Sequence, residues 1–146
     1  MNVQELHDMV AAMHRRYYDM GGPERQIEIM LCAVVHGRTA FVEMEARDRV
    51  EWYTKASAVL AAVGADAYCV ATEAWSASAS PNDPASRVPP SKRECRSEVV
   101  VTVCVDRAGD RASSILEIVR GPDGRVAELR HIEGMYMTDG AMFHLL

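Results

Sequence analysis

Apolar residues near the start of the chain recur at intervals of three and four. Such spacing places their side chains along one side of a helix. The pattern predicts a helix over residues 2–20, which should end at Gly21 and Gly22 because Pro23 follows them. The expected apolar stripe comprises Val3, Leu6, Val10, Met13 and Tyr17.

The period then changes to two, which is typical of strands. Residues 26–35 alternate at first and then become continuously apolar, and residues 38–45 alternate throughout. His36 and Gly37 lie between these segments, so we expect a β-hairpin with a tight turn. A second helix is predicted over residues 47–63, ending at Gly64, with a buried stripe of Val50, Tyr53, Ala56, Leu60 and Val63.

The pattern in the second half of the chain predicts a series of strands. We expect strands over residues 66–77, 97–106, 113–120 and 125–133, and a last edge strand in the C-terminal tail. The segment 97–106 is the most apolar and should be central. Gly121, Pro122, Asp123 and Gly124 form a clear turn signal.

This element order predicts an α+β fold. Its 146 residues suit a single domain over residues 1–146. Consecutive strands with short turns favour a two-layer structure, with a mainly antiparallel sheet of about five to seven strands and two helices on one face. Because residues 99–105 offer apolar side chains to both faces, we also expect a homodimer that buries the second face.

Residues 79–94 form an unusually long segment without regular structure. They contain four of the six prolines, Pro81, Pro84, Pro89 and Pro90, which should exclude a helix or an internal strand. Loops of this length within a domain are commonly functional. We therefore expect this loop to be a recognition element.

The charge balance and the cysteine pattern exclude some classes of protein. The chain has 16 basic and 21 acidic residues, a formal net charge of -5, which argues against a dedicated nucleic-acid binder. None of the four cysteines forms a C-x-x-C pair, and three lie in apolar runs, as expected for free thiols in a reducing cytoplasm. No basic leader precedes an apolar segment, and no apolar stretch approaches the ~20 residues that cross a bilayer, so no membrane association is expected.

Motifs for common chemistries are missing. The sequence contains no phosphate-binding glycine loop and no G-x-S-x-G elbow, and we expect neither a cofactor nor a resident metal. His7 and His14 lie about 10 Å apart along one helix, too far to share an ion, and should be solvated. His131 and Glu133 share a strand face and are weak metal candidates, without the P-C-x-x-C partner of zinc deaminases. Cys32 is interpreted as a structural thiol.

One cluster of polar and aromatic residues flanks the long loop. Side chains two apart on a strand point to one face, so residues on the two strands that flank the loop should gather at its mouth. An aromatic wall beside carboxylates and arginine can bind a small ligand or a peptide. The alternative is a cross-strand Glu–Arg ladder with the tryptophan as a packing lid. The cluster comprises Glu73, Trp75, Arg93, Arg96 and Glu98.

A strand ending in T-E-A-W, a Pro/Ser-rich segment and R-x-E at the start of a valine-rich strand resemble a group of small uncharacterised bacterial and phage-type proteins. The resemblance covers residues 66–106 and implies a recurring α+β domain, with no established activity. The residues that carry it are Thr72, Glu73, Ala74, Trp75, Pro90, Ser91, Arg96 and Glu98.

Three functions remain open from the sequence. The preferred hypothesis is a non-catalytic accessory or interaction domain of bacterial or mobile-element origin that binds itself and an unknown protein partner. The second is a small hydrolase or ligand-binding enzyme with its site around Glu73, Trp75, Arg96 and Glu98. The third, an inhibitor of a nucleic-acid enzyme, rests only on the acidic charge.

Overall fold

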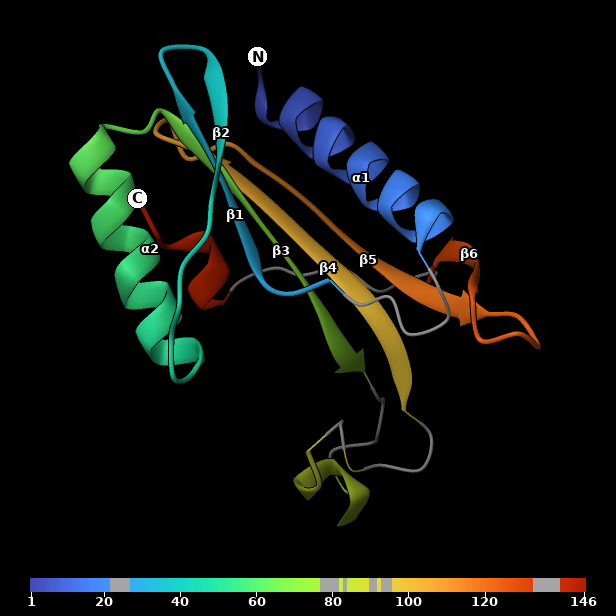
Figure 1. The fold of residues 1–146 in the computed structure, drawn as a ribbon. Helices are drawn as coiled ribbons and strands as arrows, with labels where there is room; N and C mark the ends of the chain where they lie inside the picture. The colour runs from blue at the N-terminus through green and yellow to red at the C-terminus, as the bar shows by residue number, and fades with distance from the viewer. Residues whose placement is uncertain (22–26, 77–81, 83, 90–91, 93–95, 133–139) are drawn as a thin grey trace.

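A computed structural model describes residues 1–21, 27–76, 82, 84–89, 92, 96–132 and 140–146. These residues include two α-helices, six strands and two short 3-10 helices, connected by turns and loops (Figure 1). In chain order they are α1 (Val3–Met20), β1 (Met30–Val35), β2 (Arg38–Val42), α2 (Arg49–Val63), β3 (Ala67–Ser76), η1 (Pro84–Arg87), β4 (Ser97–Asp106), β5 (Arg111–Arg120), β6 (Val126–His131) and η3 (Ala141–Phe143).

The six strands form one open antiparallel sheet in the order β2-β1-β3-β4-β5-β6. The predicted α+β class and mainly antiparallel sheet are therefore confirmed, and β4 is one of the two central strands. The predicted hairpin connects β1 and β2, where His36 and Gly37 have φ of 49° and 74°. Positive φ at both central residues gives a turn whose twist suits a two-residue hairpin.

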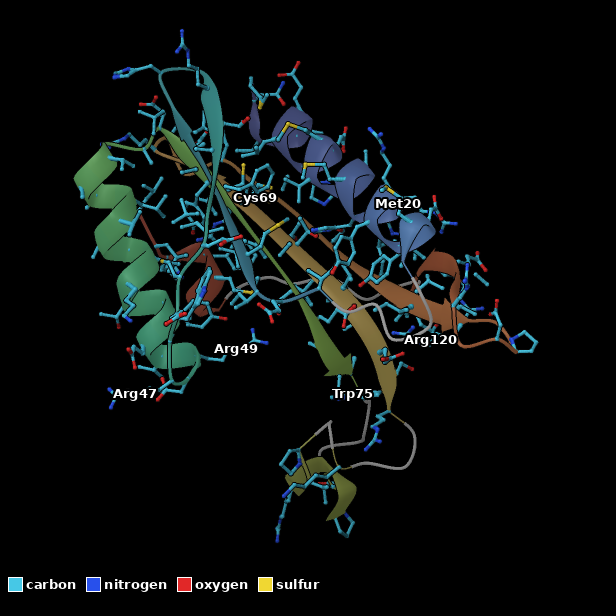
Figure 2. The ribbon with its side chains drawn as sticks, viewed as in Figure 1. Met20, Arg47, Arg49, Cys69, Trp75 and Arg120 are labelled. Atoms are coloured by element: carbon cyan, nitrogen blue, oxygen red, sulfur yellow. The ribbon has the colours of Figure 1, made fainter. Side chains whose placement is uncertain are left out.

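The helices cover opposite faces of the sheet, which corrects the prediction that both lie on one face. Leu6 and Val10 of α1 pack with Cys32, Cys69 and Cys104 of the central strands. By contrast, α2 packs with the strand residues adjacent to these cysteines, such as Leu31, Tyr68 and Val103. Neighbouring strand residues point to opposite faces, so each helix covers its own face. Figure 2 shows Cys69 on the side of α1.

Strand β4 contributes to the core on both of its faces. Val99, Val101, Val103 and Val105 belong to the cluster that contains α2, and Cys104 belongs to the cluster that contains α1. The sequence argument for a dimer assumed that one face lacked a cover. That argument fails because helices of the same chain cover both faces of the central strands.

The C-terminal tail is helical over Ala141–Phe143, so the predicted last edge strand is wrong. Met142, Phe143 and Leu145 are buried against the cluster that contains α2. Tyr68 on β3 holds the tail, since its hydroxyl donates to the Met142 carbonyl (2.6 Å) and accepts from the Leu145 N–H (3.3 Å). Burial of these side chains explains why an apolar tail need not form a strand.

The buried stripe of α2 differs in part from the prediction. Ala56 and Leu60 are buried as expected, but Val50 is 75% exposed and Val63 is 46% exposed. Trp52 is buried instead, at 3% exposure. Alanines on several sides of this helix leave its apolar pattern without a clear direction, so the sequence does not specify which side meets the sheet.

The long segment between β3 and β4 includes η1, which Figure 1 shows beyond the ends of both strands. The prediction that the prolines exclude any helix is wrong for Pro84–Arg87, since proline is tolerated in the first turn of a helix. Most other residues of the predicted loop lie outside the described part of the chain.

Candidate functional site

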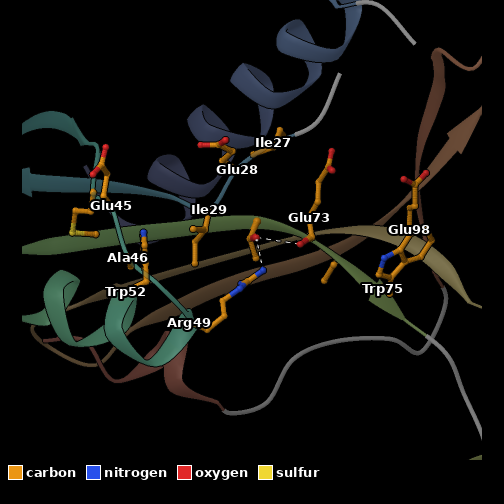
Figure 3. Close-up of a pocket in the computed structure, with 13 residues that line it drawn as sticks. Ile27, Glu28, Ile29, Glu45, Ala46, Arg49, Trp52, Glu73, Trp75 and Glu98 are labelled. Atoms are coloured by element: carbon orange, nitrogen blue, oxygen red, sulfur yellow. Dashed lines mark hydrogen bonds between the residues drawn. The ribbon is translucent and has the colours of Figure 1, made fainter. Parts of the chain in front are cut away.

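An open pocket of about 620 Å³ lies beside the second half of β3 (Figure 3). The segment that leads into β1, the segment that follows β2, the start of α2 and the strands β3 and β4 all contribute to its walls. The lining residues are Ile27, Glu28, Ile29, Met44, Glu45, Ala46, Arg49, Trp52, Thr72, Glu73, Ala74, Trp75 and Glu98.

The pocket exists because β3 is longer than its neighbour β1. Pairing between these strands ends at Met30 and Ala71, whereas β3 continues to Ser76 in register with β4. Residues 27–29 diverge from β3 and form the opposite wall of the pocket. Over residues 72–75, the side of β3 that faces away from β4 has no strand partner among the described residues.

Main-chain groups of β3 point toward this open side. The Asp66 carbonyl accepts from Arg107 N–H (3.0 Å), so it faces the β4 side. Main-chain polar groups alternate in direction along a strand, so those of Glu73 and Trp75 face away from β4. The Glu73 carbonyl also accepts from the Thr72 hydroxyl (3.1 Å). The open edge therefore offers donors and acceptors to an extended chain.

Trp75 is an exposed aromatic platform at the end of the pocket. Its side chain is 41% exposed, and the guanidinium carbon of Arg96 lies 4.5 Å from the ring centroid. Glu98 lies directly opposite Trp75 across the strand pair. A cation over an indole face is attracted by the ring quadrupole, so Arg96 holds the ring in place from one side.

The two carboxylates of the predicted cluster have fixed partners. Glu73 accepts a hydrogen bond from the Tyr18 hydroxyl of α1, and Glu98 pairs with Arg120 of β5 at 2.8 Å. Burial and the carboxylate of Glu73 together raise the pKa of Tyr18, so its hydroxyl stays a donor. Hydrogen bonding to Glu98 raises the pKa of Arg120. These contacts position both acids on the α1 side of the sheet.

The structure confirms that four of the predicted residues gather together. Glu73, Trp75 and Glu98 line one pocket, and Arg96 stacks on Trp75. The expected Glu–Arg ladder is present in one pair, Glu98 with Arg120, although Arg120 was not assigned to it from the sequence. Arg93, the fifth predicted residue, lies outside the described residues, as do Pro90 and Ser91.

Sequence reasoning missed the contribution of α2. Arg49, the first residue of that helix, donates to the Thr72 hydroxyl (3.1 Å) and places a guanidinium at the pocket wall. Figure 3 shows Arg49 directed toward β3. Only the tertiary contact between α2 and β3 reveals this residue, because it is 23 positions away from Thr72 in the chain.

The histidine interpretations are partly wrong. His7 and His14 were expected to be solvated, but they are only 9% and 4% exposed, because their side of α1 faces the sheet. His7 Nε2 lies 2.8 Å from the Ser114 hydroxyl of β5. His131 is exposed, and its proposed partner Glu133 lies outside the described residues. In the described part of the chain, no group of three or more His, Cys, Asp or Glu residues is arranged to hold a metal ion.

Cys32 is buried, and burial raises the pKa of its thiol to about 11. This environment suits the structural interpretation, because a protonated thiol is a poor nucleophile. No helix among the described residues is both long and apolar enough to cross a membrane.

Comparison with known proteins gives no matching family model, no matching curated protein and no matching solved structure. The resemblance carried by T-E-A-W and R-x-E therefore stays a prediction. Functional inference rests on the geometry of the chain itself.

Proposed function

We propose that this chain is a non-catalytic interaction domain that binds an extended, basic segment of a partner protein along the open edge of β3. The observation that carries the proposal is the extension of β3 beyond β1, beside a pocket lined by Trp75. Peptides that add a strand to a free sheet edge gain affinity from main-chain hydrogen bonds. Their specificity comes from pockets that take alternate side chains.

Charge supports a basic partner. Among the described residues, the pocket lining contains four glutamates, Glu28, Glu45, Glu73 and Glu98, and one arginine, Arg49. Arg120 neutralises Glu98, which leaves an excess of negative charge on the walls. Complementary charges speed association and disfavour wrong partners, so lysine or arginine side chains suit this surface.

The fixed partners of the two central acids favour binding over catalysis. A general acid or base must exchange a proton with its substrate, whereas Glu73 is held by Tyr18 and Glu98 by Arg120. These two contacts hold the carboxylates in place as part of the pocket wall. Trp75 supplies the exposed aromatic area that commonly dominates the energetics of an interface.

The experiment uses an octapeptide of alternating lysine and valine, labelled with a fluorophore, and measures its binding by fluorescence anisotropy. We expect saturable binding that weakens as salt is raised, because part of the attraction is electrostatic. Trp75→Ala should weaken binding by about tenfold, as for a central interface aromatic. Phe41→Ala is the matched control, since Phe41 on β2 is similarly exposed (46%) and does not line the β3 pocket, and it should leave affinity unchanged.

Two further peptides distinguish the contribution of charge from that of main-chain hydrogen bonds. An alternating glutamate and valine octapeptide should not bind, and a version with N-methylated amides on one edge should bind at least about tenfold more weakly. Equal affinity for all three peptides, or equal binding by the Trp75→Ala variant, would overturn the proposal.

The enzyme hypothesis around Glu73, Trp75, Arg96 and Glu98 is tested separately with Glu73→Gln. If this variant folds normally but loses turnover or binding of a small molecule that co-purifies with the chain, the ligand-binding alternative is supported. A large loss of folding would instead assign Glu73 to the structural contact with Tyr18. Native mass spectrometry of the gently purified protein identifies any such molecule.

The proposal also includes a homodimer and a cytoplasmic location. A homodimer is retained, now with β2 as its contact, because β2 is a terminal strand whose residues Arg38–Phe41 are exposed. Sedimentation that shows only a monomer at high concentration would contradict it. A cytoplasmic location is also proposed, because the buried free thiols suit a reducing compartment.

A further inference from the structure

A second cavity, of about 870 Å³, lies between the last turns of α1 and the β1–β2 edge of the sheet. It shares the wall formed by residues 27–29 and 44–45 with the β3 pocket, but it opens on the side of α1. Most of its lining is apolar. The lining residues are Met13, His14, Tyr17, Ile27, Glu28, Ile29, Met30, Leu31, Phe41, Val42, Glu43, Met44 and Glu45.

His14 is the unusual member of this lining. Its side chain is 96% buried, given an exposed fraction of 4%, and neither Nδ1 nor Nε2 has a hydrogen-bond partner among the described residues. Buried polar groups in folded proteins nearly always have a partner, because an unpaired donor or acceptor loses its hydration without compensation. His14 is therefore the polar side chain of this lining for which a ligand in the cavity would supply the missing hydrogen-bond partner.

Burial keeps His14 uncharged, since it lowers the pKa of this side chain to about 4, with a smaller contribution from His7. A neutral imidazole has one N–H donor and one ring nitrogen that accepts. It therefore pairs well with a hydroxyl, which can both donate and accept, or with a carbonyl. None of the described residues that line this cavity is cationic.

The charge of the cavity walls restricts the ligand further. Glu28, Glu43 and Glu45 contribute carboxylates, so a ligand with a carboxylate or phosphate group would be repelled. The apolar side chains, including the partly exposed Met13 and Phe41 near the opening, suit a hydrocarbon or aromatic body. The size lies within the range of small-molecule sites in proteins, roughly 300–1,000 Å³.

We propose that this cavity binds an uncharged, largely apolar small molecule through a single hydroxyl or carbonyl group that hydrogen-bonds His14. The site shares residues 27–29 and 44–45 with the pocket at β3, but neither Trp75 nor Arg49 lines it. It adds a small-molecule binding activity to the proposed interaction domain.

The test compares 1-octanol with octanoate, which share a chain length and differ in head-group charge. Binding is measured by isothermal titration calorimetry and by the NMR shifts of the His14 ring nitrogens. We expect saturable octanol binding, at least about tenfold weaker octanoate binding, and a shift of the His14 ring signals on adding octanol. No saturable octanol binding, or equal affinity for octanoate, would overturn the proposal.

His14→Leu isolates the hydrogen bond. This variant should raise the thermal midpoint of the ligand-free protein, because an unpaired polar group is replaced by an apolar one, and it should weaken octanol binding by about tenfold. His131→Leu is the matched control at an exposed position and should leave the affinity unchanged. Unchanged octanol affinity in the His14→Leu variant would overturn the role of this histidine.

A second variant covers the case in which His14→Leu folds poorly. Phe41→Ser alters a 46% exposed residue at the opening of the cavity, so its cost to folding is small, and it should weaken octanol binding severalfold. Trp75→Ala should bind octanol as the unaltered chain does, which separates failure of this proposal from failure of the peptide proposal. Equal octanol binding by Phe41→Ser would place the ligand elsewhere and contradict the assignment.

Discussion

Cys69 and Cys104 lie directly opposite each other on the central strands β3 and β4, with their Sγ atoms 2.6 Å apart. Cys32 on β1 lies opposite Cys69 on its other side, so three thiols form a row across three strands. All three are at most 1% exposed and pack beneath α1. Small side chains at these positions let the helix approach the sheet closely.

The first prediction concerns the reactivity of these three thiols. Burial raises the pKa of Cys32 to about 11 and holds that of Cys69 well above its ordinary value, so these two residues form few thiolates at pH 8. We expect iodoacetamide to leave Cys32, Cys69 and Cys104 unmodified in the folded chain and to modify all three in urea. Peptide mass spectrometry checks this. Fast labelling of Cys69 without denaturant would contradict the burial of the row.

The second prediction is a pH dependence of stability that His14 causes. The pKa of this residue is lowered from 6.5 to about 4 on folding, so between these values the unfolded chain binds more protons. Stability should therefore fall as the pH drops from 7 to 4, by about 3 kcal/mol from this group. Urea denaturation at a series of pH values measures the slope.

The control for this slope is His14→Leu, which should remove that part of the pH dependence. His7 and the nearby carboxylates Glu28, Glu43 and Glu45 remain in both chains, so the difference between the curves isolates His14. Parallel curves for the two chains would show that His14 is accessible to protons in the folded state.

The third prediction tests which side of α2 meets the sheet. Trp52 is 3% exposed and belongs to the largest buried cluster, so Trp52→Ala should lower the free energy of unfolding by about 3–5 kcal/mol. Val50→Ala, at a 75% exposed position two residues earlier, should change it by less than about 0.5 kcal/mol. Chemical denaturation compares both. Similar losses for the two variants would contradict the orientation of the helix.

The fourth prediction concerns the hydroxyl that holds the C-terminal tail. Tyr68→Phe removes the donor to the Met142 carbonyl and the acceptor of the Leu145 N–H, and leaves both in a buried setting. We expect a loss of about 2 kcal/mol and faster digestion of the tail by carboxypeptidase. Tyr53→Phe on α2 is the matched control and should change neither. A Tyr68→Phe variant with unaltered tail protection would assign the tail's position to apolar packing alone.

The open edge of β3 illustrates why the candidate site was predictable only in part. The spacing of Glu73 and Trp75 indicated a shared face, and pairing of the flanking strands predicted that Glu98 and Arg96 lie nearby. Tyr18, Arg49 and Arg120 come from distant parts of the chain, so no local pattern connects them to that cluster. The length difference between β3 and β1, which creates the pocket, also depends on where the chain leaves the sheet.

Periodicity by itself determined the helices, the strands and the α+β class, because helices and strands impose different spacings on apolar residues. Only the tertiary structure decided that the helices cover opposite faces, that Trp52 and His14 are buried, and that the apolar tail packs as a short helix. These outcomes depend on which surfaces meet in three dimensions. A strand with apolar residues on both sides requires two covers, and the sequence does not state which segments provide them.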